Sequence, residues 1–271
     1  MVPGLEIASL GVRLTSLDET GSTNADALAA ARAGDPGPHW FVARRQRAGR
    51  GRGGRGWVSE PGNLHATLLI GDVAPRIAAQ LGFVAGLALH EAVSAVTGLD
   101  AGRLRIKWPN DLLLDGAKLA GILLEAETQG EGRLAVVIGF GVNVAAAPEG
   151  LPYPAAALGA VSPAVEVSTL FAALTRSMAA RLGQWRGAHA RGEPDAFAAI
   201  RRRWLDLAAG LGQPITVRLP RGERNGRFAG LDETGRLMLD AADGRHLIDA
   251  GDVILPAAGP PRVPTMTDQG W

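Results

Sequence analysis

The segment Arg44–Trp57 reads RRQRAGRGRGGRGW and contains six arginines, five glycines and no acidic residue. It shows no apolar period, so we predict no regular helix or strand between Arg44 and Gly56. Glycine lets a backbone approach a ligand closely, and guanidinium groups bind phosphates or carboxylates through paired N–H donors. The composition therefore predicts a loop that binds a multi-oxygen anion, although a flexible basic loop that touches RNA fits the same composition equally well.

The segments on both sides of this loop show alternating strand and helix patterns. We expect strands at 12–17, 40–43, 64–70, 104–106, 111–114, 117–124 and 134–139, and helices at 23–34, 75–98 and 167–187. A capping box is expected at the start of the first helix, in which the Thr23 hydroxyl accepts from the backbone N–H of Asp26 and the Asp26 carboxylate reaches back. These patterns predict an α+β (α/β) fold with one central mixed sheet flanked by helices.

From Gln213 onward the pattern changes to short strands at 215–219, 227–231, 237–239 and 246–248, which are separated by turns. Several short strands with such turns predict a small β-barrel. We therefore expect three parts: a main domain over residues 1–209, the barrel over 210–256, and a disordered tail over 257–271.

Composition excludes several classes of function. The 271 residues carry 28 basic and 27 acidic side chains, and the net charge of +1 argues against a protein coated in positive charge for non-specific nucleic-acid binding. Cysteine is absent, which excludes disulfides, thiolate zinc sites and cysteine nucleophiles. The sequence shows neither a signal-peptide pattern nor an uninterrupted apolar stretch of membrane-spanning length, so we expect a cytoplasmic protein with no membrane partner.

Three further segments place polar groups or glycines at strand ends. Lys107-Trp108-Pro109-Asn110-Asp111 groups an amine, an amide and a carboxylate, which suit contacts with phosphate and nucleoside, although Pro-Asn-Asp also forms ordinary β-turns. Lys118–Gly121 follows a hairpin turn, and Gly139–Asn143 lies at the end of a strand. Glycine inside a strand often marks the close approach of a ligand, and a simple β-bulge is the alternative.

The order and spacing of these motifs, together with Ser22-Thr23-Asn24, resemble those of the biotin protein ligases. The resemblance covers about residues 15–144, and the C-terminal strands match more loosely. It implies a class II synthetase-like catalytic domain followed by an SH3-like β-barrel. It also implies that biotin and ATP form biotinyl-5′-AMP with release of pyrophosphate, and that biotin is then transferred to a lysine of a biotin carboxyl carrier domain, as in acetyl-CoA carboxylase.

The resemblance also implies roles for single residues. Arg52 and Lys118 would contact the biotin carboxylate and the α-phosphoryl oxygens, Lys107 would neutralise the phosphates, and Asp111 would be an electrostatic or base partner of the acceptor lysine. The implied biotin-binding residues are Ser22, Thr23, Gln46, Gly49, Arg50, Arg52, Lys118 and Gly121. The implied ATP-binding residues are Arg50, Arg52, Trp57, Lys107, Asn110, Asp111 and Asn143. Magnesium would be carried by the ATP, because the sequence shows no certain metal ligand.

Several alternatives stay open. A lipoate or octanoyl ligase or transferase has a similar fold, and an Arg/Gly-loop nucleic-acid-binding module is a further alternative. The motif that begins at Ser22 leaves no room for the N-terminal DNA-binding domain of some relatives, so we expect no DNA partner. Leu255 and Pro256 stand where some relatives have an arginine that touches ATP. The sequence is compatible with a monomer or a homodimer.

Overall fold

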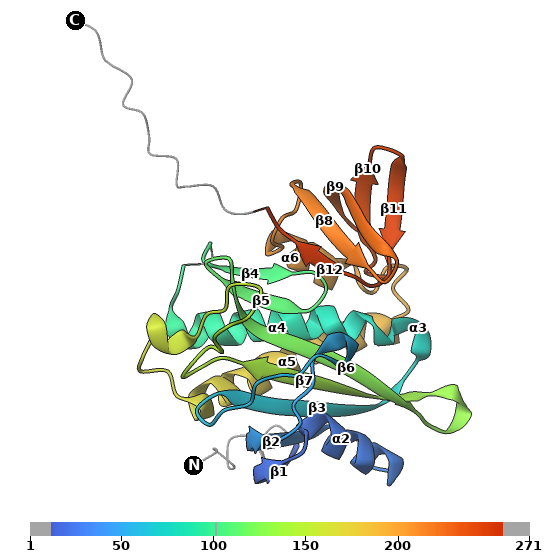
Figure 1. The fold of residues 1–271 in the computed structure, drawn as a ribbon. Coiled ribbons are helices and arrows are strands. Elements are labelled where there is room, and N and C mark those ends of the chain that lie inside the picture. Colours follow the sequence, from blue (N-terminus) through green and yellow to red (C-terminus); the bar gives the residue numbers. More distant parts are fainter. Residues whose placement is uncertain (1–11, 101, 257–271) are drawn as a thin grey trace, which may run out of the picture.

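The computed structural model describes residues 12–100 and 102–256. They form a larger unit with a central sheet and helices, and a smaller unit made of strands (Figure 1). Gly210, where we place the predicted domain boundary, lies between the last helix and the first strand of the smaller unit. The tail over 257–271, which we predict to be disordered, lies outside the described residues.

The central sheet has seven strands in the order β1-β2-β3-β7-β6-β5-β4. Its strands are β1 (Arg13–Thr20), β2 (His39–Gln46), β3 (Leu64–Val73), β4 (Leu104–Lys107), β5 (Asp111–Leu114), β6 (Ala117–Thr128) and β7 (Leu134–Val142). β1 and β2 are parallel, since a helix connects them, and every other neighbouring pair is antiparallel. The predicted mixed sheet is confirmed.

Helices lie on both faces of this sheet, which is why its central strands are apolar on both sides. The helices are α2 (Thr23–Arg32), α3 (Pro75–Ala78), α4 (Gln80–Thr97), α5 (Val167–Ala190) and α6 (Ala198–Asp206). On one face, Leu28 of α2 packs with Leu69 of β3. On the other face, Leu64 and Leu68 of β3 join the main core, which contains α4, α5 and α6. The alternation along β3 therefore separates two cores.

The segment formed by α3 and α4, Pro75–Thr97, is long and apolar enough to cross a membrane, but 67% of its apolar 18-residue stretch is buried inside the protein. Phe83 of α4 packs edge-to-face on Trp204 of α6, with ring centroids 5.4 Å apart. α4 ends at Gly98, whose φ of 64° is left-handed, as expected for a glycine that closes a helix. The hydropathy of this segment is that of a helix buried in a protein core.

The smaller unit is a five-stranded antiparallel sheet in the order β11-β10-β9-β8-β12. Its strands are β8 (Pro214–Leu219), β9 (Gly222–Leu231), β10 (Leu237–Ala241), β11 (Gly244–Ile248) and β12 (Asp252–Ile254). This sheet confirms the predicted C-terminal β unit, and the sequence pattern missed only β12. Trp108 of the larger unit donates from Nε1 to the Gly235 carbonyl at 3.3 Å, which links the two units.

The prediction of an irregular segment from Arg44 is wrong for its first three residues. β2 continues through Gln46, because Arg45 and Gln46 pair with β1 beyond Ala43, the last residue of β2 that pairs with β3. Arg44 and Arg45 are exposed there. Pairing with the edge strand β1 is made here by the backbone and by ion pairs of Arg44 with Asp18 and of Arg45 with Glu19, so an apolar pattern is not required. A short 3-10 turn at Arg52–Gly54 is the other regular piece.

Candidate active site

Five residues form one row across the central sheet. His65 of β3 pairs with Gly141 of β7, and Gly141 pairs with Gly121 of β6. Gly121 in turn pairs with Asp111 of β5, and Asp111 pairs with Lys107 of β4. Paired residues in neighbouring strands point to the same face of a sheet. The row therefore sets an amine and a carboxylate beside two residues without side chains, on the face that also carries α2.

Asp111 pairs with both lysines of this region. Its carboxylate oxygens lie 2.9 Å from Lys107 Nζ and 2.6 Å from Lys118 Nζ. Burial opposes ionisation of Asp111, but the charges of Lys118 and Lys107 outweigh burial and hold the pKa of its carboxyl below the ordinary value. Asp111 is therefore ionised at neutral pH. The structure brings together three residues that the sequence motifs placed in two separate segments.

Arg52 lies at the boundary between the two units. Its Nη1 donates to Asn110 Oδ1 at 3.3 Å and to the Gly251 carbonyl oxygen at 3.2 Å, and it lies 3.6 Å from Asp252 Oδ1. Burial lowers the pKa of Arg52, which the charge of Asp252 opposes, and a guanidinium stays protonated at neutral pH. Arg52 and Asn110 thus meet as predicted site residues, while β12 supplies partners that the sequence motifs did not indicate.

The loop arginines on either side of Arg52 also have distant acidic partners. Arg50 Nη2 donates to both carboxylate oxygens of Glu125 in β6, at 3.1 and 3.0 Å. Arg55 lies 3.0 Å from Asp252 and donates from Nε to the carbonyl oxygen of Arg52. The loop that contains no acidic residue is therefore neutralised by carboxylates from other parts of the chain.

Thr23 and Gln46, both predicted to bind biotin, are hydrogen-bonded to each other. The backbone N and Oγ1 of Thr23 donate to Gln46 Oε1 at 2.9 and 3.1 Å, and Gln46 Nε2 donates to Ser59 Oγ at 2.9 Å. The predicted capping box is wrong, because Ser22 is the N-cap residue of α2 and its side chain makes no capping hydrogen bond. The Thr23 hydroxyl is held by tertiary contacts and not by the helix terminus.

A second polar group lies behind Thr23 and was not predicted. Thr67 Oγ1 lies 2.8 Å from Thr23 Oγ1 and 2.7 Å from Asn24 Oδ1, and Asn24 Nδ2 donates to Glu125 Oε2 at 2.9 Å. A Cβ atom on Gly139 would lie 2.2 Å from Asn24 Oδ1, so only glycine fits there. The sequence offered one signal for this polar group, which is that Asn24 and Gly139 both stand in the quoted motifs.

Trp57 fills the space above the glycine row. A Cβ atom on Gly141 would lie 2.4 Å from Trp57 Cε2, and one on Gly121 would lie 3.3 Å from Trp57 Cζ3. The pairing of β6 with β7 continues without a shift through both glycines, so the alternative of a β-bulge is wrong for the Gly139–Asn143 segment. In the Lys118–Gly121 segment the register of β5 against β6 does shift, opposite Lys118 and Ala120, so a bulge lies next to Gly121. Gly49 has a similar constraint, because a Cβ atom there would lie 2.6 Å from Ser59 Oγ. These glycines allow an indole and a polar side chain to approach the backbone.

A small cavity opens beside Trp57. Its lining includes Lys118, Asn143, Tyr153 and the apolar side chains of Val58, Pro148 and Leu151. Asn143 Nδ2 donates to the Ala156 carbonyl at 3.0 Å, which fixes the amide, while its Oδ1 is buried and has no hydrogen-bond partner in the described part of the chain. Trp57 Nε1 is also buried without such a partner. One acceptor and one donor without a partner are therefore buried in residues that line the cavity, and Trp57 Nε1 faces Gly141.

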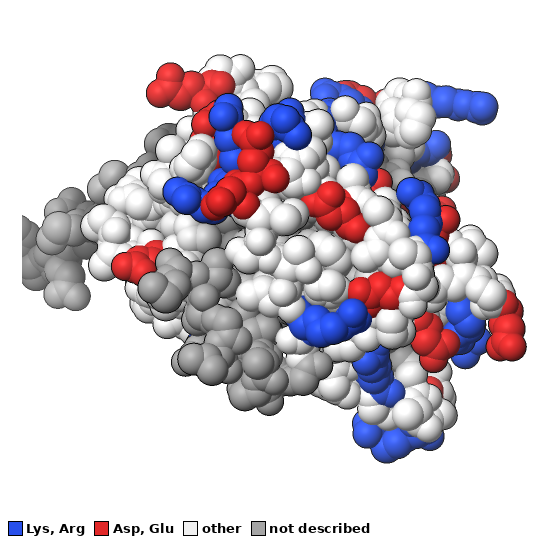
Figure 2. Space-filling model, turned by 90° about the horizontal axis from the view of Figure 1, so that it is seen from below, with Lys and Arg blue, Asp and Glu red and all other residues white. Residues whose placement is uncertain are grey.

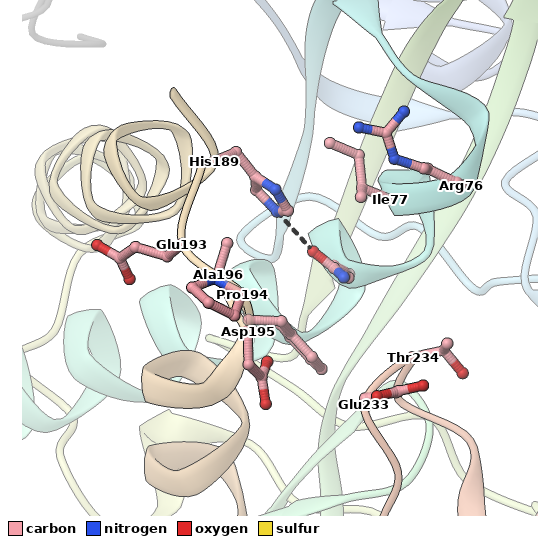
Figure 3. A pocket seen from close by; sticks show the side chains of 11 residues that line it. Arg76, Ile77, His189, Glu193, Pro194, Asp195, Ala196, Glu233 and Thr234 are labelled. Atoms are coloured by element: carbon pink, nitrogen blue, oxygen red, sulfur yellow. Dashed lines mark hydrogen bonds between the residues drawn. The ribbon is translucent and has the colours of Figure 1, made fainter. Parts of the chain in front are cut away.

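A larger hollow lies elsewhere. It measures about 300 Å³ and is bordered by Arg76, His189, Glu193, Asp195 and Glu233 (Figure 3). His189 Nε2 contacts the side-chain oxygen of Gln80 at 2.9 Å, which is the dashed line in the figure. None of the predicted site residues borders this hollow. We place the chemistry at the smaller cavity, because Lys118, which pairs with the buried Asp111, lines it together with Trp57 and Asn143, each of which has an unpartnered polar atom.

Surface charge is mixed. On the face turned downward in Figure 1, where β1 and α2 lie, acidic and basic side chains intermingle and form no coat of one sign (Figure 2). Only two lysines occur in the sequence, Lys107 and Lys118, and every other basic residue is arginine. Both lysines contact the same buried carboxylate. The scarcity of lysine in the sequence could have singled out these two positions. The spacing of the motifs alone did not show that the two lysines meet.

Comparison with known proteins agrees with this geometry. Residues 22–143 match the family model described as the biotin/lipoate A/B protein ligase family, and residues 210–255 match the biotin protein ligase C-terminal domain. A biotin–[acetyl-CoA-carboxylase] ligase of Paracoccus denitrificans is 43% identical over 88% of this chain and 98% of its own length. The ligase of the same name from Mycobacterium tuberculosis is 36% identical over 89% of this chain and 88% of its own length.

Solved structures show the same fold. The biotin protein ligase from Aquifex aeolicus, in complex with biotin and ATP, superposes with a TM-score of 0.71 at 25% identity and covers 89% of this chain and 97% of its own. The two family models match the two units that the structure separates, and the identity to curated ligases extends over most of the chain. The chain belongs to the biotin protein ligase family.

Proposed function

We propose that the chain is an ATP-dependent ligase that forms biotinyl-5′-AMP from biotin and ATP and then transfers biotin to a lysine of a biotin carboxyl carrier domain. The observation that carries this proposal is the arrangement of Arg52, Lys107, Lys118 and Asp111 beside the cavity at Trp57. The first half-reaction needs cations where two anions meet. The second half-reaction needs a bound amine as the acceptor. We place the reaction in the cytoplasm, where ATP is available and a chain without cysteine is at no disadvantage.

The first half-reaction brings a carboxylate to the α-phosphate, and both are anionic. Lys107 and Lys118 reach the same point from β4 and β6, and Arg52 adds a guanidinium held by Asn110. Cations in a partly buried site stabilise the negative charge that builds up on phosphoryl oxygens, typically by several kcal/mol. A carboxylate nucleophile is already ionised, so this step needs no general base.

The neutral end of biotin suits the Thr23–Gln46 group. A ureido ring presents one carbonyl acceptor and two N–H donors, and hydroxyl and amide side chains can satisfy both kinds. Ser22, Thr23 and Gln46 lie together at the start of α2 and the end of β2, and Ser22 and Thr23 are buried. Ligand binding would exchange the present Thr23–Gln46 contacts for contacts with biotin.

The cavity beside Trp57 suits an adenine ring. Asn143 lines this cavity, and its buried, unpartnered Oδ1 would become an acceptor for an exocyclic amine when the ligand enters, while the indole of Trp57 would offer an aromatic face. Guanine carries a carbonyl oxygen at the same ring position, which would meet that Oδ1 without a proton between them. We therefore expect ATP to be used in preference to GTP.

Magnesium would arrive with the nucleotide. In residues 12–100 and 102–256, His, Asp and Glu form no group of three or more that could hold a metal, and Asp111 is already engaged by two lysines. Mg²⁺ prefers phosphate oxygens and water. When bound it would neutralise part of the charge of the triphosphate, and Lys107 would add a further positive charge.

In the second half-reaction the amine of the carrier lysine attacks the mixed anhydride. The lowered pKa of Asp111 makes it a poor proton acceptor, so we assign it an electrostatic role and not the role of a general base. Its charge holds Lys107 and Lys118 in place and offsets part of their positive charge as the acceptor ammonium approaches.

Incubation with biotin, ATP, magnesium and a biotin carboxyl carrier domain tests this function, with intact-mass analysis of the carrier as the readout. We expect the carrier to gain one biotinyl group, and no gain when ATP is omitted. Lipoate in place of biotin is the matched control. A carrier that gains mass with lipoate and none with biotin would contradict the proposal and favour the lipoate branch of the fold.

A further inference from the structure

The chain contains two lysines among 28 basic residues, and neither is freely exposed. The side chains of Lys107 and Lys118 are 22% and 20% exposed, and both pair with Asp111. All other basic side chains are guanidinium groups, over the whole sequence. The only other primary amine is the α-amino group at the start of the chain.

This distribution matters because the reaction proposed above makes an amine-reactive product. A neutral primary amine forms a C–N bond to the carbonyl carbon of biotinyl-5′-AMP, the C–O bond to phosphate breaks, and AMP leaves with the electron pair. The amine nitrogen then releases one proton to solvent water. An ammonium group has no lone pair for this attack, and guanidinium stays protonated at any physiological pH.

The two lysines are the amines nearest to the reacting carbonyl in the proposed site. Lys118 Nζ lies 5.8 Å from the centre of the Trp57 ring and 5.7 Å from that of Tyr153, so it borders the cavity. Asp111 is the only ion-pair partner of either lysine in the described residues, at 2.6 and 2.9 Å. Both lysine side chains are thus held in ion pairs with one carboxylate, and Arg52, which donates to Asn110 Oδ1, also lies within electrostatic reach of Asp111.

We infer that the enzyme protects itself from its own activated product: Asp111 keeps Lys107 and Lys118 from attacking the mixed anhydride, and the surface offers arginine where lysine would be acylated. This inference rests on the proposed ligase reaction. It assigns Asp111 a specificity role, which is to leave the amine of the partner as the one competent nucleophile at the site.

The test compares two variants that differ only in the carboxylate, Lys107→Met and the double variant Lys107→Met with Asp111→Asn. Removing Lys107 together with the carboxylate keeps the net charge of the cluster unchanged, which favours folding of the double variant. Each protein receives chemically prepared biotinyl-5′-AMP at a saturating concentration, without biotin, ATP or carrier. Peptide mass spectrometry then measures acylation of Lys118, and the α-amino group is mapped separately.

We expect Lys118 of the double variant to be acylated at least about tenfold faster than Lys118 of Lys107→Met. Asp111→Glu in the Lys107→Met background should restore protection. A non-hydrolysable adenylate analogue should suppress the labelling, because labelling of an unfolded chain would not respond to it. Equal rates in the two variants, or labelling that the analogue does not suppress, would overturn the role of Asp111.

A second variant tests the surface. Arg47 is 70% exposed and lies outside the proposed catalytic residues, so Arg47→Lys introduces one accessible amine. Under the same conditions we expect biotin on Lys at position 47 and none on Lys107 or Lys118 of the same molecules. An unmodified residue 47 would contradict the surface part of the inference. Because the adenylate is supplied, a defect in adenylation cannot produce either result, so the ligase function is tested separately by its own assay.

Discussion

The two cationic segments of the site neutralise their charge in opposite ways. Between Lys107 and Lys118 the carboxylate of Asp111 lies within the same short segment, and all three side chains are largely buried. In the Arg44–Trp57 loop the partners of Arg50 and Arg55 are Glu125 and Asp252, 75 and 197 residues away, and the ion pairs are partly exposed.

This difference predicts different responses to mutation. A buried ion pair cannot lose one partner without leaving a desolvated charge, so each member is needed by the others. A half-exposed ion pair contributes little, because water replaces either partner. The lysine segment is therefore a rigid part of the site, whereas the arginines of the loop can exchange their carboxylate partners for a ligand.

The largest effect is expected from Asp111→Ala. It leaves two lysines without their partner, so the free energy of unfolding should fall by about 3–5 kcal/mol. Urea denaturation followed by tryptophan fluorescence measures this. Arg103→Ala breaks the exposed pair with Asp115 in the same hairpin without changing the left-handed residue Asp115, so it is the matched control and should cost much less than Asp111→Ala. Equal losses would remove the contrast between buried and exposed pairs.

The pH dependence of stability sharpens the same point. The pKa of Asp111 is lowered in the folded state, so its contribution is complete above the ordinary Asp value of about 3.9 and is lost as pH falls through the lower folded value. Asp111→Ala should lack this acid-side loss. The difference in unfolding free energy between wild type and variant should therefore shrink on acidification from pH 5 to below about pH 3.

Lys118→Ala should have the next largest effect, this time on catalysis. Loss of one preorganised cation at the reacting phosphate should lower the rate of biotin-dependent pyrophosphate release by about 10²–10³-fold. Lys118→Arg should not restore it, because the planar guanidinium does not fit a site shaped for a compact ammonium. Arg103→Ala is the control and should retain the rate within about twofold. Full activity of Lys118→Ala would sink the proposed role.

A smaller effect is expected from Gly141→Ala. The added methyl group would lie 2.4 Å from the Trp57 ring, so the indole must move and the walls of the cavity change. Overpacking of this kind costs about 1–3 kcal/mol, and we expect weaker ATP binding by calorimetry. Gly130→Ala, in the turn between the same two strands, has open space and should leave ATP binding unchanged. Unaltered binding in both variants would contradict the placement of adenine beside Trp57.

The smallest effect on stability is expected from Asp252→Ala. Its pair with Arg55 is partly exposed, so the free energy of unfolding should change by less than about 1 kcal/mol. Arg52 and Arg55 would nevertheless lose their anchor on β12, and we expect the KM for ATP in the adenylation assay to rise several-fold. Asp249→Ala is the control, since Asp249 is exposed and has no ion pair among the described residues. A KM that rises equally in both would show that Asp252 does not position the loop.

Local patterns predicted the strands and helices of the larger unit because apolar periodicity survives wherever an element is packed on a core. They failed at Arg44–Gln46, where β2 continues along the edge strand β1 through backbone pairing and exposed ion pairs of Arg44 with Asp18 and of Arg45 with Glu19. They also failed at Thr23, where the pattern of a capping box coincides with a hydroxyl that bonds Gln46, 23 residues away. Short-range rules cannot decide between a local and a distant partner of the same chemistry.

The sequence by itself determined which chemical groups are available: an arginine and glycine loop without acids, two lysines and one aspartate at strand ends, and glycines in β6 and β7. Only the tertiary structure decided that the two lysines share Asp111, that Asn24 and Trp57 occupy the space left by Gly139 and Gly141, and that Gly251 and Asp252, at the start of β12, hold Arg52. The physical reason is that residue types and short spacings are set along the chain, whereas strand register sets which side chains meet. Lys107, Asp111, Gly121, Gly141 and His65 form one row only because five strands pair in that register.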